Sequence, residues 1–115
     1  KVYGFPTQIG DFNLSPIDSC NVNGLITGAD IHPNGKFALV GYKNFHSFIW
    51  VFQTNMSKFF SEPRFIDLGM LENAQTEGIC FSKEGDLFFS CEKTENYNQQ
   101  IWKIGKKQLK NLKQK

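Results

Sequence analysis

Short runs rich in apolar residues, separated by turn residues, make up most of this chain. Residues 26–31, 37–42, 48–52 and 64–68 each have the length and composition of a β-strand. Between the first two runs, His32-Pro33-Asn34-Gly35 carries the proline and glycine of a tight reversal. The connection over residues 55–63 is longer, and residues 57–60 are a candidate for a short helical turn. The pattern predicts a complete four-stranded antiparallel unit over residues 25–70.

The same pattern recurs fifty residues further along the chain. Gly28 and Gly78 are 50 positions apart, as are Gly35 and Gly85. An aromatic-centred strand follows in each copy, at residues 49–52 and 101–104. The repeat predicts a last unit of three strands over residues 71–104. Residues 105–115 then form a basic polar tail, a candidate for a short helix or for an outer strand completed elsewhere. Residues 1–24 are expected to hold the third and outer strands of a preceding unit.

Several strand positions are apolar on both faces, as at Cys80 and Phe88 between the apolar residues Ile79, Phe81 and Phe89. A sheet with one face in water would alternate, so both faces of these strands are expected to be buried. A repeat of this length built of short strands is typical of propeller blades. We therefore predict an all-β fold of four-stranded antiparallel β-propeller blades, with a single sandwich as the alternative. Because rings need about four to eight blades, the chain is expected to be the C-terminal part of a longer protein.

Composition supports a folded domain and narrows the classes of partner. The hydrophobic fraction of 40% and the twelve phenylalanines are enough for a core. The net charge of +2 lies largely in the tail, which is better explained as a solvated terminus than as a nucleic-acid or membrane-surface site. No apolar run approaches the roughly 20 residues of a membrane span, and no signal peptide is evident.

The cysteines Cys20, Cys80 and Cys91 lack the spacing of metal ligands. Turn length places Cys80 opposite Leu87 or Phe89 rather than opposite Cys91, so a disulfide across this hairpin is not expected. All three are expected to be buried thiols that pack as small apolar residues.

Four stretches of the chain carry a family resemblance: residues 25–42 (LITGADIHPNGKFALVGY), 48–52 (FIWVF), 59–62 (FFSE) and 75–93 (QTEGICFSKEGDLFFSCEK). Their order resembles bacterial six-bladed propellers of the SdiA-regulated or NHL-like type, and more distantly those of gluconolactonase and strictosidine-synthase relatives. The resemblance implies a six-bladed ring and an extracytoplasmic location. In the gluconolactonase-like enzymes a metal-binding Glu precedes a glycine of an inner strand, which implies a metal ligand at Glu77.

Propeller topology brings the start of an inner strand and the end of the second strand to one rim of the central channel, where propellers bind ligands. The rim positions are the ligand-binding candidates: Glu77, Glu92 and Lys93 in the last blade, and Thr27 and Tyr42 in the blade before. In one of two hairpin registers Glu77 faces Glu92, and such a pair of carboxylates would bind a cation. A plain surface ion pair between Glu92 and Lys93 is the alternative. Asp30 is a further channel-lining candidate, because a charge on an inner strand needs water or a donor.

Three roles are compatible with these residues. The first is a non-enzymatic binding or scaffold domain that recognises a protein or a glycan at the rim, together with the remainder of its own propeller. The alternative is a lactonase- or esterase-type hydrolase in which a divalent ion such as Ca²⁺, held by Glu77, polarises a carbonyl. A third possibility is that the chain completes the ring of a larger partner.

The loop over residues 44–48, with His46 at an exposed position, is a candidate for displaying aromatic side chains to a partner. No Ser-His-Asp order, phosphate loop, HExxH or CxxC pair occurs.

Overall fold

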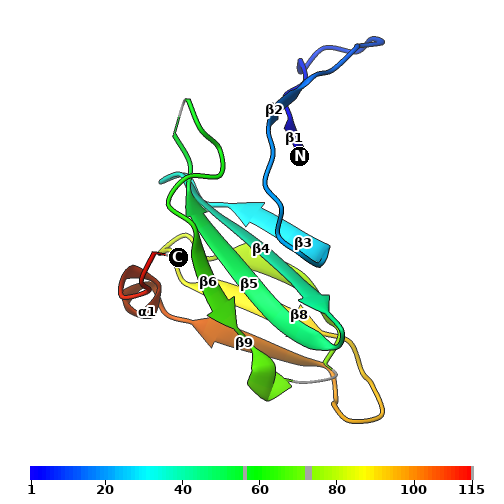
Figure 1. The fold of residues 1–115 in the computed structure, drawn as a ribbon, viewed down its shortest axis with the longest axis vertical. Coiled ribbons are helices and arrows are strands. Elements are labelled where there is room, and N and C mark those ends of the chain that lie inside the picture. Colours follow the sequence, from blue (N-terminus) through cyan, green and yellow to red (C-terminus); the bar gives the residue numbers. More distant parts are fainter. Residues whose placement is uncertain (56, 72–73, 115) are drawn as a thin grey trace.

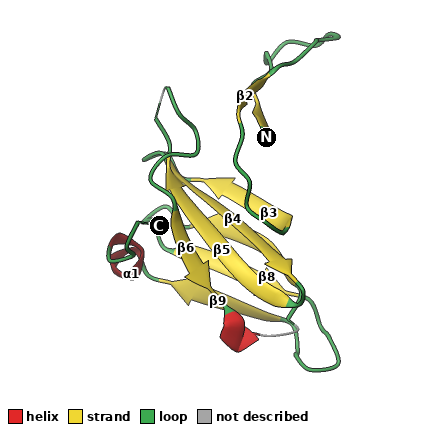
Figure 2. Ribbon diagram, viewed as in Figure 1, coloured by secondary structure: helices red, strands yellow, loops and turns green. Residues whose placement is uncertain are grey.

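The computed structural model of the chain describes residues 1–55, 57–71 and 74–114, and the fold is all-β with antiparallel sheets (Figures 1 and 2). An N-terminal ribbon pairs β1 (Val2–Tyr3) with β2 (Pro16–Asp18). The central sheet has the order β3 (Leu25–Ile31), β4 (Lys36–Lys43), β5 (His46–Gln53) and β6 (Arg64–Asp67). The C-terminal sheet has the order β7 (Thr76–Phe81), β8 (Leu87–Cys91) and β9 (Gln100–Ile104). A 3-10 turn, η1 (Gly69–Leu71), joins the two sheets, and the helix α1 (Lys106–Lys110) follows β9.

The strands predicted over residues 25–70 form one four-stranded meander, and the three strands predicted after it form a second sheet. The helical turn considered at residues 57–60 does not form. The side chain of Asn55 accepts the N–H groups of Ser57 and Lys58, at 3.0 and 2.8 Å, and so holds this segment in a turn instead. The tail forms α1, whose Leu109 is fully buried and anchors it to the core.

The central and C-terminal sheets pack face to face around the larger hydrophobic core. The central sheet contributes small aliphatic side chains from β4 and β5, among them Ala38, Val40, Ile49 and Val51. The C-terminal sheet contributes Leu87, Phe89 and Cys91 from β8, with Trp102 and Ile104 packed beside them. Both faces of β4 and β5 are buried. The expectation that both faces of β7 and β8 are buried was wrong, because Cys80 is exposed and Phe88 is only half-buried on the face turned away from this core.

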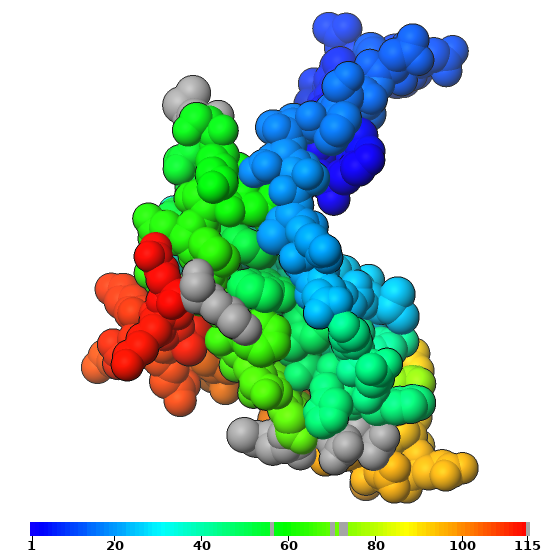
Figure 3. Space-filling model, viewed as in Figure 1, coloured from blue at the N-terminus to red at the C-terminus, as the bar shows by residue number. Residues whose placement is uncertain are grey.

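The opposite face of the central sheet is aromatic and only partly covered. Phe37, Leu39, Phe52 and Phe60 form a second cluster there, with Val2 and Val22 of the N-terminal segment against it. The Asp18 carboxylate connects the ribbon to this cluster by accepting the N–H groups of Phe60 and Phe59, at 3.0 and 2.9 Å. Both hydrogen bonds lower the pKa of Asp18, and the bond from Phe60 has the larger effect. The rest of the ribbon projects away from the body (Figure 3).

Two expectations, one about the register of the last hairpin and one about the burial of the cysteines, were wrong. Cys80 pairs with Phe88, not with Leu87 or Phe89, because Gly85 adopts a left-handed conformation (φ 90°) in the turn and pairs Ser82 with Asp86. Cys80 and Cys20 are exposed rather than buried, and only Cys91 is buried; all three are free.

Candidate functional site

The two sheets meet along β3 and β7, which are the first strands and edge strands of their sheets. Three side chains from the first repeat bond to the main chain of the second. Thr27 Oγ1 donates to Thr76 O at 2.6 Å, and Asp30 Oδ2 accepts the N–H of Phe81 at 2.7 Å. His32 Nε2 lies 3.1 Å from Lys83 O. The paired residues are 49, 51 and 51 positions apart, so the junction follows the fifty-residue repeat of the sequence.

Gly28 lets the two strands approach at their closest point. A Cβ atom at this position would lie 2.8 Å from Glu77 O and 3.3 Å from Ile79 N, which is too close for a side chain. Both strands also carry a bulge here, between Ile26 and Gly28 in β3 and between Thr76 and Ile79 in β7. The bulge in β3 turns Thr27 toward β7, and both bulges locally interrupt the hydrogen bonding between neighbouring strands.

A pair of buried hydroxyls lies beside this contact. Ser47 and Thr76 are 1% and 0% exposed. Ser47 Oγ donates to Ala74 O at 2.9 Å, and Thr76 Oγ1 lies 3.3 Å from Ser47 Oγ. Because buried hydroxyls are costly unless they are bonded, these contacts fix the start of β7 against the end of the central sheet.

The structure therefore gives structural partners to two residues that were predicted to line a channel. The side chains of Thr27 and Asp30 are partly buried and engaged with β7. Tyr42, at the end of β4, is half-buried and lines a hollow of about 290 Å³ with Asn23 and Lys43. The hydrogen bonds of Thr27 and Asp30 thus help to hold the two sheets together.

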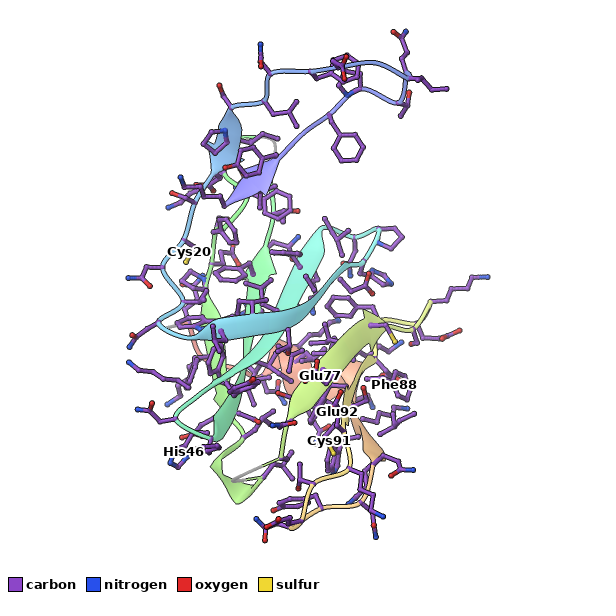
Figure 4. All side chains as sticks on the ribbon, turned by 90° about the vertical axis from the view of Figure 1, so that its right-hand side faces the viewer. Cys20, His46, Glu77, Phe88, Cys91 and Glu92 are labelled. Carbon is purple, nitrogen blue, oxygen red and sulfur yellow. The ribbon has the colours of Figure 1, made fainter. Side chains whose placement is uncertain are left out.

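The three candidates of the last repeat lie at the matching end of the C-terminal sheet. Glu77 is half-buried within the bulge of β7, whereas Glu92 and Lys93 are exposed just after β8 (Figure 4). The register in which Glu77 faces Glu92 is wrong, because the N–H of Glu92 donates to Gln75 O at 2.9 Å and the bulge offsets Glu77. Among the described residues, no group of three or more His, Cys, Asp or Glu side chains is placed to hold a metal ion. The calcium-dependent hydrolase remains a hypothesis in which Glu77 is the metal ligand.

A pocket that was not predicted from the sequence lies at the end of the central sheet where β4 turns into β5. Its volume is about 370 Å³. Aromatic side chains of β5 and β6 form its floor, and polar side chains of the turn, the preceding loop and the end of β6 form its rim. The floor residues are Phe48, Trp50 and Phe65, and the rim residues are Asn23, Lys43, Asn44, His46 and Asp67.

The rings of the aromatic floor pack against one another in tilted contacts. The rings of Trp50 and Phe65 are 4.9 Å apart at 59°, and those of Phe48 and Phe65 are 5.9 Å apart at 30°. On the rim, Lys43 Nζ donates to Asn23 Oδ1 at 2.7 Å, and Asp67 Oδ1 accepts the N–H of Gly69 at 2.8 Å. The pocket is therefore largely preformed, as small-molecule sites usually are.

Left-handed backbone gathers around this pocket. Asn23, Asn44 and Phe45 have φ values of 53°, 49° and 68°. Asn tolerates this conformation, but a bulky aromatic residue does so at a cost of about 1–3 kcal/mol. The second position of such a two-residue hairpin turn is usually glycine. Phe45 occupies it instead and leaves its ring 65% exposed at the tip. Strain kept at an exposed aromatic residue is typical of a functional site.

Comparison of the chain with models of protein families, with curated proteins and with solved structures finds no match. Within the described part of the chain, no helix is long and apolar enough to cross a membrane.

Proposed function

We propose that this chain is a non-catalytic binding domain that recognises its ligand at the β4–β5 tip. The observation that carries the proposal is the pocket of about 370 Å³ with an aromatic floor and a polar rim, next to the strained, exposed Phe45. Ligand sites combine apolar walls with a few fixed polar groups in this way. The repeat junction between β3 and β7 supports the finer fold assignment, in which the two sheets are successive blades of a β-propeller. The resemblance to bacterial six-bladed propellers supports an extracytoplasmic location.

The composition of the pocket favours a glycan as the ligand. Flat aromatic rings such as Trp50 and Phe65 pack well against the apolar face of a sugar ring, while amides and a carboxylate pair with its hydroxyls. The rim holds one cation, Lys43, and one carboxylate, Asp67, so its formal charge is balanced. A neutral, hydroxyl-rich ligand fits that balance better than a strongly charged one.

The substitution Phe45→Gly separates binding from stability. Glycine adopts the left-handed turn without strain, so the free energy of unfolding should rise by about 1 kcal/mol. Loss of the exposed ring should at the same time weaken glycan binding. Urea denaturation measures the first effect, and binding of the purified protein to an array of immobilised glycans measures the second.

The control for this pair of effects is Ile9→Ala, which removes another exposed apolar side chain from the distant ribbon loop. It should change neither measurement. Wild-type protein that binds no glycan on the array, or a Phe45→Gly variant that binds as strongly as the wild type, would contradict the proposal.

A further inference from the structure

The far face of the C-terminal sheet is uncovered, although its repeat counterpart in the central sheet is buried. Cys80 pairs with Phe88 across β7 and β8, and Ser90 pairs with Ile101 across β8 and β9, so these side chains share the face turned away from the core. We call these four residues the leading face. Cys80 is exposed, Ile101 is 75% exposed, and a shallow hollow of about 290 Å³ lies over the face.

The repeat shows what such a face does in this molecule. A step of 50 residues relates Phe88 to Ala38 and Ser90 to Val40, and a step of 52 relates Ile101 to Ile49. In the central sheet those three counterparts are 0% exposed, because they form the surface on which the C-terminal sheet packs. The leading face is thus the next copy of an interface that already exists once within the chain.

The surface that would complete this interface is present at the other end of the same molecule. The C-terminal sheet meets the central sheet through Ile79, Phe81, Leu87 and Phe89. The counterparts of these four residues, 50 positions earlier, are Ala29, Ile31, Phe37 and Leu39. Together with Ile26 they form what we call the receiving face.

The receiving face is only partly covered by the N-terminal segment. Phe37 and Leu39 are buried, each 8% exposed, with Val2 and Val22 packed against them. Ile26 and Ile31 are 39% and 50% exposed, and Ala29 is also exposed. A hollow of about 300 Å³ opens beside Ile26, Ala29 and Phe37. One molecule therefore carries an open leading face and a partly open receiving face, which are the two sides of its own internal interface.

We propose that a second copy of this chain docks head to tail, with its leading face on the receiving face of the first. The contact continues the internal junction between the two sheets, and Gly78 takes the part that Gly28 plays within the chain. Among the described residues, Ser90 Oγ of the same sheet, at 2.9 Å, is the one atom within 4 Å of a Cβ placed at Gly78. The outer side of Gly78 is therefore open to the close approach of a second copy. Lys103 lies beside Phe88, and its Nζ is 2.7 Å from Asp86 Oδ2. Because this ion pair balances the charge of Lys103, the lysine does not disfavour the contact.

Such an interface joins two different surfaces, so it does not stop at a dimer. A heterologous contact closes into a ring or continues as a filament, depending on the rotation that it imposes. Blocking either face in one copy should end the growth. This property distinguishes the proposal from a symmetric dimer, in which a single patch meets itself.

Two lysine substitutions test the proposal in the 115-residue chain. Ile101→Lys blocks the leading face and Ala29→Lys blocks the receiving face, both at exposed positions. The mass in solution is measured by sedimentation at increasing concentration, up to about 1 mM. Wild-type protein should grow beyond the 13.2 kDa monomer, and each variant alone should remain monomeric. A mixture of the two variants should form a dimer and nothing larger, because one intact face of each kind remains.

Ile9→Lys, in the ribbon loop, is the matched control and should associate like the wild type. Circular dichroism and the unfolding temperature verify that each variant is folded. The proposal is overturned if the wild type remains monomeric throughout, which is also the result expected if an unrelated partner covers the leading face. It is equally overturned if either variant still associates alone, or if their mixture stays monomeric.

Discussion

Gly28→Ala is expected to lower the free energy of unfolding by about 2–3 kcal/mol. The added Cβ would lie 2.8 Å from Glu77 O and 3.3 Å from Ile79 N, and both are main-chain atoms of β7. Main-chain atoms cannot turn aside as a flexible side chain does, so the two sheets must separate to admit the methyl group. Urea denaturation, monitored by tryptophan fluorescence, measures the loss.

The repeat supplies the control for this substitution. A Cβ at Gly78 would meet only the Ser90 hydroxyl, which can rotate away. Gly78→Ala is therefore expected to change the free energy of unfolding by no more than about 0.5 kcal/mol. Equal losses at the two glycines would contradict the close approach of β3 and β7.

Leu87→Ala is expected to cost about 2–5 kcal/mol of stability, the usual price of a large cavity in a core. Leu87 is 0% exposed and belongs to the cluster that joins β8 to the central sheet. Removing it leaves a void between two sheets that are each held in place by strand pairing and cannot easily collapse. The loss is measured as a lower urea midpoint of unfolding, with an unchanged slope (m-value) of the free energy of unfolding against urea concentration.

Ile101→Ala removes a comparable side chain from the leading face of the same sheet. Ile101 is 75% exposed, so its truncation should change stability by about 0.5 kcal/mol or less in the monomer. If Leu87→Ala cost as little as Ile101→Ala, the two sheets would not share a common core.

The strands could be predicted because their signal is local. Alternating and continuous apolar runs between turn residues place β3 to β9 within a few residues of where they lie, and the fifty-residue step pairs the strands of one sheet with those of the next. The registers could not be predicted in the same way. Bulges in β3 and β7 insert an unpaired residue, which moved Glu77 out of line with Glu92.

The candidate sites were harder to predict, because their partners lie on other elements. Asp30 needed a donor, and sequence alone could not reveal that the donor was the N–H of Phe81 in the next sheet. The pocket gathers residues from the loop before β3, the β4–β5 turn and β6, so no single stretch shows it. One signal was readable in advance, since Asn44-Phe45 stands where a hairpin turn would ordinarily have Asn-Gly.

The junction between β3 and β7 holds the two sheets together, and the amide of Phe81 reports on it directly. The neighbouring N–H of Ser82 bonds to Asp86 across the hairpin, so that of Phe81 points away from β8, toward Asp30. Hydrogen exchange read by NMR should show the Phe81 amide protected in the wild type. In Asp30→Ala it should exchange about tenfold faster or more, given that a lost acceptor costs about 1–3 kcal/mol, while Ser82 stays protected. A Phe81 amide that exchanges equally fast with and without Asp30 would contradict the account.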